Sequence, residues 1–118
     1  MGTFSYPTRI STMDGENWRV LEATVDTGAF FTMLPGRLLR ELGVLPTETA
    51  VLEMADSRGV EWEIGEARAT IDGASVATIV VFGEDDVPPL LGDYTLEGLR
   101  LAVDPTHQRL VPAHLIMY

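Results

Sequence analysis

LEATVDTGAFFTMLP, residues 21–35, is the stretch that decides the fold of this 118-residue chain. Apolar and polar residues alternate over Trp18–Val25, which predicts a strand whose odd-numbered residues face the core as the strand runs inward. Another short apolar strand is predicted over Phe31–Leu34. Between the two strands lies Asp26-Thr27-Gly28-Ala29. Since aspartate and glycine both favour turns, this tetrapeptide taken alone indicates no more than a turn.

One helix is predicted directly after this stretch. Pro35 suits the first position of a helix, because its missing N–H has no partner there in any case. Leucines then recur at helical spacing over 38–42, and Gly43 is the residue type that ends a helix. Upstream, Phe4–Thr12 is predicted as an edge or bulged strand because it contains a proline.

Two hairpins follow the predicted helix. Strands are expected over Glu48–Ala55 and Val60–Ile71, joined by the turn-forming residues Asp56, Ser57, Arg58 and Gly59. A second turn at Asp72-Gly73 leads into a buried strand over Ser75–Phe82.

The last third of the chain predicts a helix between two apolar segments. Leu90-Leu91-Gly92 precedes a short helix over Tyr94–Leu99, and a final hairpin over Leu101–Val111 turns at residues 105–108. Turn signals every ten residues or so favour a closed barrel or a sandwich. We therefore expect one mainly-β domain over residues 1–118, with one or two short helices.

Composition and charge exclude several classes of function. The net charge of −10 opposes binding to nucleic acids and to anionic membrane surfaces. With no cysteine and only two histidines, seven residues apart, the sequence contains no zinc-binding spacing, and we expect no metal and no cofactor. No apolar run is long enough to span a bilayer, and the first ten residues do not resemble a signal peptide. The expected location is the cytoplasm.

The succession of motifs around Asp26 resembles the retropepsin family of aspartic proteases, which includes retroviral proteases and single-domain bacterial relatives. The specific elements are the Asp-Thr-Gly-Ala loop at 26–29 and the apolar-apolar-Gly-helix element that begins at Leu90. The resemblance extends over about residues 22–112. It implies a closed, barrel-like acid-protease fold with one lobe in each chain.

The resemblance also implies an aspartic endopeptidase that acts on polypeptides. Two adjacent carboxylates cannot both ionise, so one keeps a proton and acts as an acid while the other acts as a base. Asp26 would be the catalytic carboxylate. Asp72-Gly73-Ala74 lacks the hydroxyl residue of a second motif and is interpreted as a turn. The second carboxylate must then come from another copy of the chain, in a homodimer with two-fold symmetry.

Other residues receive roles by the same resemblance. Thr27 would hydrogen-bond across the dimer axis, Gly28 would allow close approach of backbone and substrate, and Ala29 would complete the catalytic loop. The turn Asp56–Gly59 would be the tip of a flap that closes over the substrate. The alternative for this hairpin is an ordinary exposed turn.

The sequence departs from the family pattern at two positions. Retroviral proteases usually have an Asp after Asp-Thr-Gly-Ala, paired with an Arg after the second Gly, whereas this chain has Phe30 and Asp93. A catalytically inactive module that dimerises and binds peptides is therefore an alternative, as is an unrelated small β-barrel. The apolar tail at 115–118 would pack at the dimer interface or on its own domain.

Overall fold

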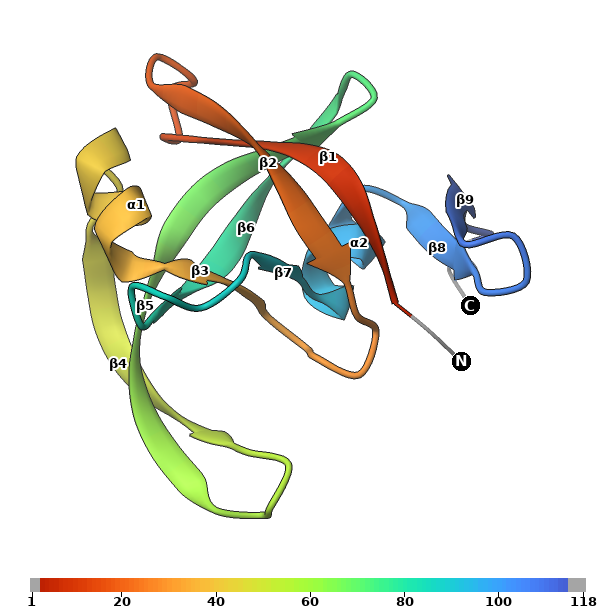
Figure 1. Cartoon of the computed structure of the whole chain (residues 1–118). Coiled ribbons are helices and arrows are strands. Elements are labelled where there is room, and N and C mark those ends of the chain that lie inside the picture. The colour runs from red at the N-terminus through yellow and green to blue at the C-terminus, as the bar shows by residue number, and fades with distance from the viewer. Residues whose placement is uncertain (1–2, 115–118) are drawn as a thin grey trace.

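A computed structural model describes residues 3–114, which fold into a mainly-β structure with two short helices among the described residues (Figure 1). In chain order the elements are β1 (Phe4–Ser11), β2 (Trp18–Val25), β3 (Thr32–Pro35), α1 (Gly36–Leu42), β4 (Pro46–Glu53), β5 (Gly59–Ile71), β6 (Ala74–Gly83), β7 (Leu90–Leu91), α2 (Asp93–Gly98), β8 (Leu101–Asp104) and β9 (Arg109–Pro112).

Seven of these strands form one closed sheet. The strand order is β1-β2-β7-β3-β6-β5-β4, and β1 also pairs with β5, which closes the sheet into a barrel. Closure is possible because β5 is 13 residues long. One end of β5 pairs with β4 and the other end pairs with β1. The hairpin of β4 and β5 therefore projects from the barrel as an arm (Figure 1).

The two-residue strand β7 sits between two strands that come from distant parts of the barrel. It runs parallel to β2, with Val25 opposite Leu91, and antiparallel to β3, with Met33 opposite Leu90. Strand β3 in turn runs parallel to β6. The loop that follows β2 is consequently bounded by β7 on one side and by the start of β3 on the other.

Buried apolar side chains form two clusters. The first packs α1 against one end of the barrel and comprises Ile10, Leu34, Leu39, Leu42, Val44, Ala67, Ala69, Val80 and Phe82. The second packs α2 against the other end and comprises Ala23, Val25, Ile71, Leu91, Leu96 and Leu99. The predicted burial of the odd-numbered residues of β2 is confirmed from Leu21 onward, while Arg19 is exposed.

Two predictions that involve glycine are confirmed: the end of the first helix at Gly43 and the turn at Asp72-Gly73. Gly43 ends α1 in the left-handed conformation with φ 100°, which only a residue without a side chain adopts readily. Asp72 and Gly73, with φ of 50° and 85°, form the turn between β5 and β6. The Tyr6 hydroxyl also donates a 2.6 Å hydrogen bond to the Asp72 carboxylate, which anchors that turn to β1.

The prediction for Pro35 was wrong by one residue. Pro35 precedes the first helical residue, Gly36, with φ −55° and ψ 129°. It lies opposite Gly83 as the last residue of β3, and this pairing keeps its ψ extended. The expectation for the tail at 115–118 lies outside the described residues. Among the described residues, no helix has both the length and the apolar character needed to cross a membrane.

Candidate active site

Asp26 lies directly after β2, in a loop that backbone hydrogen bonds hold in place. Its own amide donates to the Leu91 carbonyl at 3.1 Å, and the Ala29 amide donates to the Asp26 carbonyl at 3.1 Å. The amide of Gly28 donates to Oδ1 of the Asp26 side chain at 2.9 Å. The half-buried carboxylate is thus oriented by the chain itself, and its second oxygen is left for another partner.

The segment from β7 into α2 holds the Asp26 loop from both ends. Leu91 accepts from the amide of Asp26, and two residues later the amide of Asp93 donates to the Ala29 carbonyl at 2.9 Å. The amide of Tyr94 then donates to the Phe30 carbonyl at 2.8 Å. The loop therefore has a rigid support, as a catalytic group needs if it is to keep its geometry.

Gly92 makes this support possible. A Cβ atom at this position would lie 2.5 Å from the carbonyl carbon and oxygen of Phe31 and 2.7 Å from the carbonyl oxygen of Phe30. These are backbone atoms, which cannot move aside as the end of a flexible side chain can. Gly92 is therefore needed for the close approach of α2 to the loop rather than for an unusual φ angle, which is −93° here.

Three buried threonines form hydrogen bonds with one another, and one of them also binds the Gly92 amide. The hydroxyl of Thr95 lies 2.7 Å from that of Thr32 and 2.8 Å from that of Thr78. The Gly92 amide donates to the Thr32 hydroxyl at 3.1 Å. This threonine network joins β3, β6 and α2, and it satisfies polar groups that would otherwise be buried at a cost.

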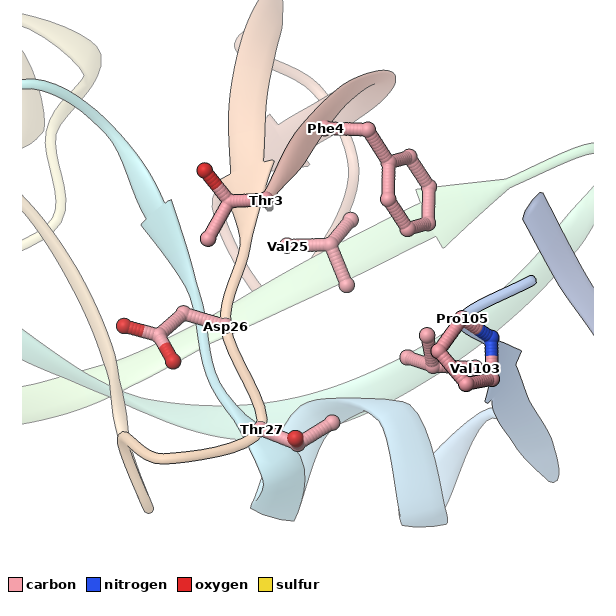
Figure 2. A pocket seen from close by; sticks show the side chains of 7 residues that line it. All are labelled: Thr3, Phe4, Val25, Asp26, Thr27, Val103 and Pro105. Carbon is pink, nitrogen blue, oxygen red and sulfur yellow. The ribbon is translucent and has the colours of Figure 1, made fainter. Parts of the chain in front are cut away.

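Asp26 and Thr27 border a hollow of about 430 Å³ on the side of the barrel where α2 and β8 lie (Figure 2). The other lining residues are Thr3, Phe4, Val25, Val103 and Pro105. In Figure 2 the carboxylate of Asp26 points away from Val103 and Pro105, which lie on the far side of the hollow. Two of the predicted site residues, Asp26 and Thr27, therefore border the same hollow.

A second hollow, here called the cleft, lies between the Asp26 loop and the β4–β5 arm. It encloses about 370 Å³. Its lining side chains are apolar except for that of Glu53, and the lining residues are Gly28, Ala29, Phe30, Phe31, Met33, Leu52, Glu53, Met54, Ala55 and Val81. The Asp26 loop and the arm are thus brought together by the fold, although they are more than twenty residues apart in sequence.

The predicted flap tip forms a tight turn at the end of the arm. The Ser57 amide donates to the Met54 carbonyl at 2.9 Å, and Ser57 has a positive φ of 66°. Arg58 contacts Asp56 through its amide and its guanidinium. Asp56, Ser57, Arg58 and Gly59 are all exposed and do not line the cleft, whereas residues 52–55 just before them do.

An aromatic side chain, Phe30, occupies one of the two positions at which this chain departs from the retroviral pattern, and the other position is Asp93. Phe30 is 58% exposed, and its ring centroid lies 4.8 Å from that of Phe31 and 5.6 Å from that of Tyr94. Phe31 and Tyr94 are 5.7 Å apart, so the three rings form one aromatic cluster. Edge-to-face contacts at such distances are favourable. They give the loop an apolar contact with Tyr94 of α2.

Two features of the site were not predicted from the sequence. Residues 52–55 line the cleft because the arm curves toward the Asp26 loop, which no local pattern reveals. The threonine network joins residues up to 63 positions apart. Within residues 3–114, no group of three or more histidine, aspartate or glutamate side chains is arranged to hold a metal ion.

Comparisons with known proteins bear on the fold. No protein-family model matches the chain, and no curated protein sequence matches it. Among solved structures, the simian foamy virus (mac) protease has a TM-score of 0.53 at 19% identity, covering 77% of this chain and 91% of that one. The retroviral protease-like domain of Ddi1 from Leishmania major has a TM-score of 0.59 at 20% identity, covering 98% and 91%.

The chain therefore has the retropepsin-like fold, as the sequence predicted. The alternative of an unrelated small β-barrel is wrong. At these identities the likeness establishes the fold, so activity has to be argued from the site itself.

Proposed function

We propose that this protein is an aspartic endopeptidase that hydrolyses polypeptides as a homodimer, with Asp26 of each chain forming the catalytic pair. The observation that carries this proposal is the setting of Asp26. Its carboxylate is held at the end of a barrel strand by the Gly28 amide, and Gly28 also lines the apolar cleft beside it. A reactive group at the edge of a cleft, on a rigid support, is the arrangement that catalysis requires.

The reaction follows from a pair of carboxylates that share one proton. The ionised carboxylate of one Asp26 takes a proton from water while the water oxygen bonds to the scissile carbonyl carbon. The other Asp26 donates its proton to the carbonyl oxygen. The first Asp26 then gives the proton that it took from water to the amine nitrogen as the C–N bond of the tetrahedral intermediate breaks. The other Asp26 regains a proton from a hydroxyl of that intermediate as the carboxylic acid product forms. No group is oxidised or reduced, and the pair returns to its starting state.

The homodimer is part of the proposal because the chain carries one such loop. Asp26 and Thr27 lie together at the surface, with Asp26 half-buried and Thr27 exposed, so a two-fold axis beside them would bring two copies of each residue together. Thr27 would then hydrogen-bond across the axis.

The β4–β5 arm would act as the flap. It projects from the barrel, its turn at Asp56–Gly59 is exposed, and the residues just before the turn line the cleft. Movement of this arm would admit an extended polypeptide and then exclude water from it. Strand β4 pairs with β5 on one side only, so its other edge offers unpaired backbone groups to an added strand.

The proposal is tested with the wild type and Asp26→Asn, each incubated with a mixture of denatured proteins between about pH 4 and pH 7. New peptide termini are identified by mass spectrometry. Termini made by the wild type alone are the expected result. If both proteins are folded and dimeric but neither makes new termini, the peptidase proposal fails and the peptide-binding module takes its place.

A further inference from the structure

We infer that Glu84 and Asp86 make this protein select polypeptides that carry a basic side chain, lysine or arginine, beside the part that lies in the cleft. The two residues line a further hollow of about 360 Å³, here called the acidic hollow. Its other lining residues are Met33, Trp62, Val87 and Pro88. Met33 lines the cleft as well, so the two hollows adjoin. The inference rests on the proposed function, because it takes the cleft as the place where the polypeptide lies.

The loop between β6 and β7 presents the two carboxylates to the acidic hollow and directs the acidic residue between them elsewhere. The amide of Val87 donates to the Glu84 carbonyl at 3.1 Å, which closes a turn. The Asp85 carboxylate accepts from the amide of Arg37, in the first turn of α1, at 3.3 Å, and Asp85 is not part of the lining. The contact between Asp85 and α1 thus fixes a turn that places Glu84 and Asp86 at the hollow.

Neither of these two carboxylates has a basic partner within the part of the chain that the structure describes. The ion pairs found there use other acidic residues, which are Glu41, Asp56, Glu63 and Asp104. Two like charges on one short turn repel each other, so a cation held beside both of them is favourable. The net charge of −10 adds a long-range attraction for basic polypeptides.

The rest of the lining suits a long basic side chain better than a metal ion. Met33, Val87 and Pro88 offer apolar surface to the stem of a lysine or arginine, whose charged end would stay beside the carboxylates. Trp62 adds an indole, the aromatic group that attracts cations best. Calcium and magnesium ions take about six or more oxygen ligands, whereas only two carboxylates line this hollow.

Trp62 gives an independent indication that a ligand belongs here. Its Nε1 atom is buried and has no hydrogen-bond partner within residues 3–114. A buried donor without an acceptor is unfavourable, and such groups are rare in folded proteins. Trp62 lies in β5 of the arm, opposite Ala50 of β4. Movement of the arm would let a backbone carbonyl of the polypeptide accept from this N–H while a basic side chain occupies the acidic hollow.

The inference is tested by binding to the Asp26→Asn protein, measured by fluorescence anisotropy. The probes are labelled neutral peptides with one arginine at each position in turn, and a matching set in which citrulline, of the same shape but without charge, replaces the arginine. We expect one position at which arginine binds about tenfold more tightly than citrulline, the combined effect of a few exposed charge contacts. The difference should shrink in about 1 M salt.

Variants with matched changes of charge locate the effect. Glu84→Gln/Asp86→Asn should reduce the preference for arginine to less than about twofold. Glu16→Gln/Glu22→Gln removes the same number of charges at exposed positions outside the acidic hollow and should keep the preference. Glu84→Arg/Asp86→Arg should instead favour a peptide with glutamate at that position over one with glutamine, a gain that misfolding cannot produce.

The emission of Trp62 reports whether the peptide reaches the acidic hollow. In Trp18→Phe, made in the Asp26→Asn protein, Trp62 is the one tryptophan that remains. Its emission should change when the preferred arginine peptide binds. An unchanged emission on binding would place the peptide elsewhere and overturn the inference.

Cleavage by the wild type separates this inference from the peptidase proposal. Equal binding of arginine and citrulline at every position overturns the inference, as does a preference that Glu84→Gln/Asp86→Asn leaves unchanged or that the control variant loses equally. If the wild type still makes new peptide termini in that case, the peptidase proposal stands. If arginine is preferred in binding but the wild type cleaves nothing, the inference stands for a peptide-binding module and the peptidase proposal fails.

Discussion

Gly92 and Phe31 approach so closely that the space between them admits no side chain at position 92. A Cβ there would lie 2.5 Å from the Phe31 carbonyl group. This approach brings the amides of Asp93 and Tyr94 to the carbonyls of Ala29 and Phe30, so the position of the Asp26 loop depends on it.

We expect Gly92→Ala to destabilise the protein by about 3 kcal/mol or more, because the methyl group would meet backbone rather than movable side chains. Urea unfolding measures the change. Gly98→Ala is the control, since a Cβ there meets a methyl of Val76 at 3.1 Å and alanine suits a helix better than glycine. If Gly92→Ala and Gly98→Ala both unfold with a free energy close to that of the wild type, the start of α2 and the loop at Phe30 and Phe31 are not tightly packed.

Gly28→Ala should lower activity more than it lowers stability. A Cβ at position 28 would lie 3.1 Å from Oδ1 of Asp26, so the carboxylate must shift by a few tenths of an ångström. A displacement of this size in a catalytic group should reduce kcat/KM by about tenfold. Steady-state kinetics and urea unfolding are compared for the same samples. Unchanged kinetics would mean that Asp26 is not positioned by its contact with Gly28.

The threonine network should contribute to stability through its hydroxyl groups. Thr95→Val keeps the shape of the side chain but leaves the hydroxyls of Thr32 and Thr78 without the partner they have now. We expect a loss of about 1–3 kcal/mol in the free energy of unfolding. Thr95→Ser, which keeps the hydroxyl, should lose less of the free energy of unfolding than Thr95→Val does. Thr49→Val, at an exposed position of β4, should change stability by less than about 0.5 kcal/mol; an equal loss there would indicate a general effect of removing hydroxyls.

The turn between β8 and β9 should weaken in acid. The hydrogen bond with the His107 side chain is the main cause that lowers the pKa of Asp104, assisted by the His107 amide and by Arg109, while partial burial opposes them. A carboxylate with a lowered pKa stabilises the fold at pH values above its unfolded pKa. That contribution is lost as the pH falls through the lower, folded pKa.

The amide signals of Thr106 and His107 report this change, because both amides donate to Oδ1 of Asp104 at 3.2 and 3.3 Å. In an NMR titration from about pH 6 to pH 2 they should shift below the pH at which an unperturbed aspartate titrates. Asp104→Asn should remove the shift. A titration at the ordinary pKa of aspartate would contradict the proposed contacts.

Local sequence patterns predicted most of the barrel. The alternation in β2, the glycine after α1 and the turn at Asp72-Gly73 act within a few residues, so the sequence alone reveals them. The start of the helix was predicted one residue too early, at Pro35, because the conformation of Pro35 is set by pairing with Gly83, which lies 48 residues further along the chain. Strand pairing of this kind is a tertiary effect.

For the candidate site, too, local features could be predicted from the sequence and tertiary features could not. Asp26 was identified by its tripeptide and by the strands on either side of it. The role of Gly92 as a close contact and the hydroxyl network of Thr32, Thr78 and Thr95 depend on segments that meet only in the folded chain. The second carboxylate that the proposed function requires would come from another molecule, and pairing of two chains is likewise not a local property of the sequence.

The central claim is that one active site needs Asp26 from two chains, and mixing experiments test it most directly. Wild type and Asp26→Asn are unfolded together, refolded at different ratios and assayed for cleavage per wild-type chain. If only wild-type pairs are active, this specific activity falls in proportion to the wild-type fraction, to about half at an equal ratio and about a tenth at one to nine. Activity per wild-type chain that stays constant at every ratio would contradict the account, because each chain would then be catalysing on its own.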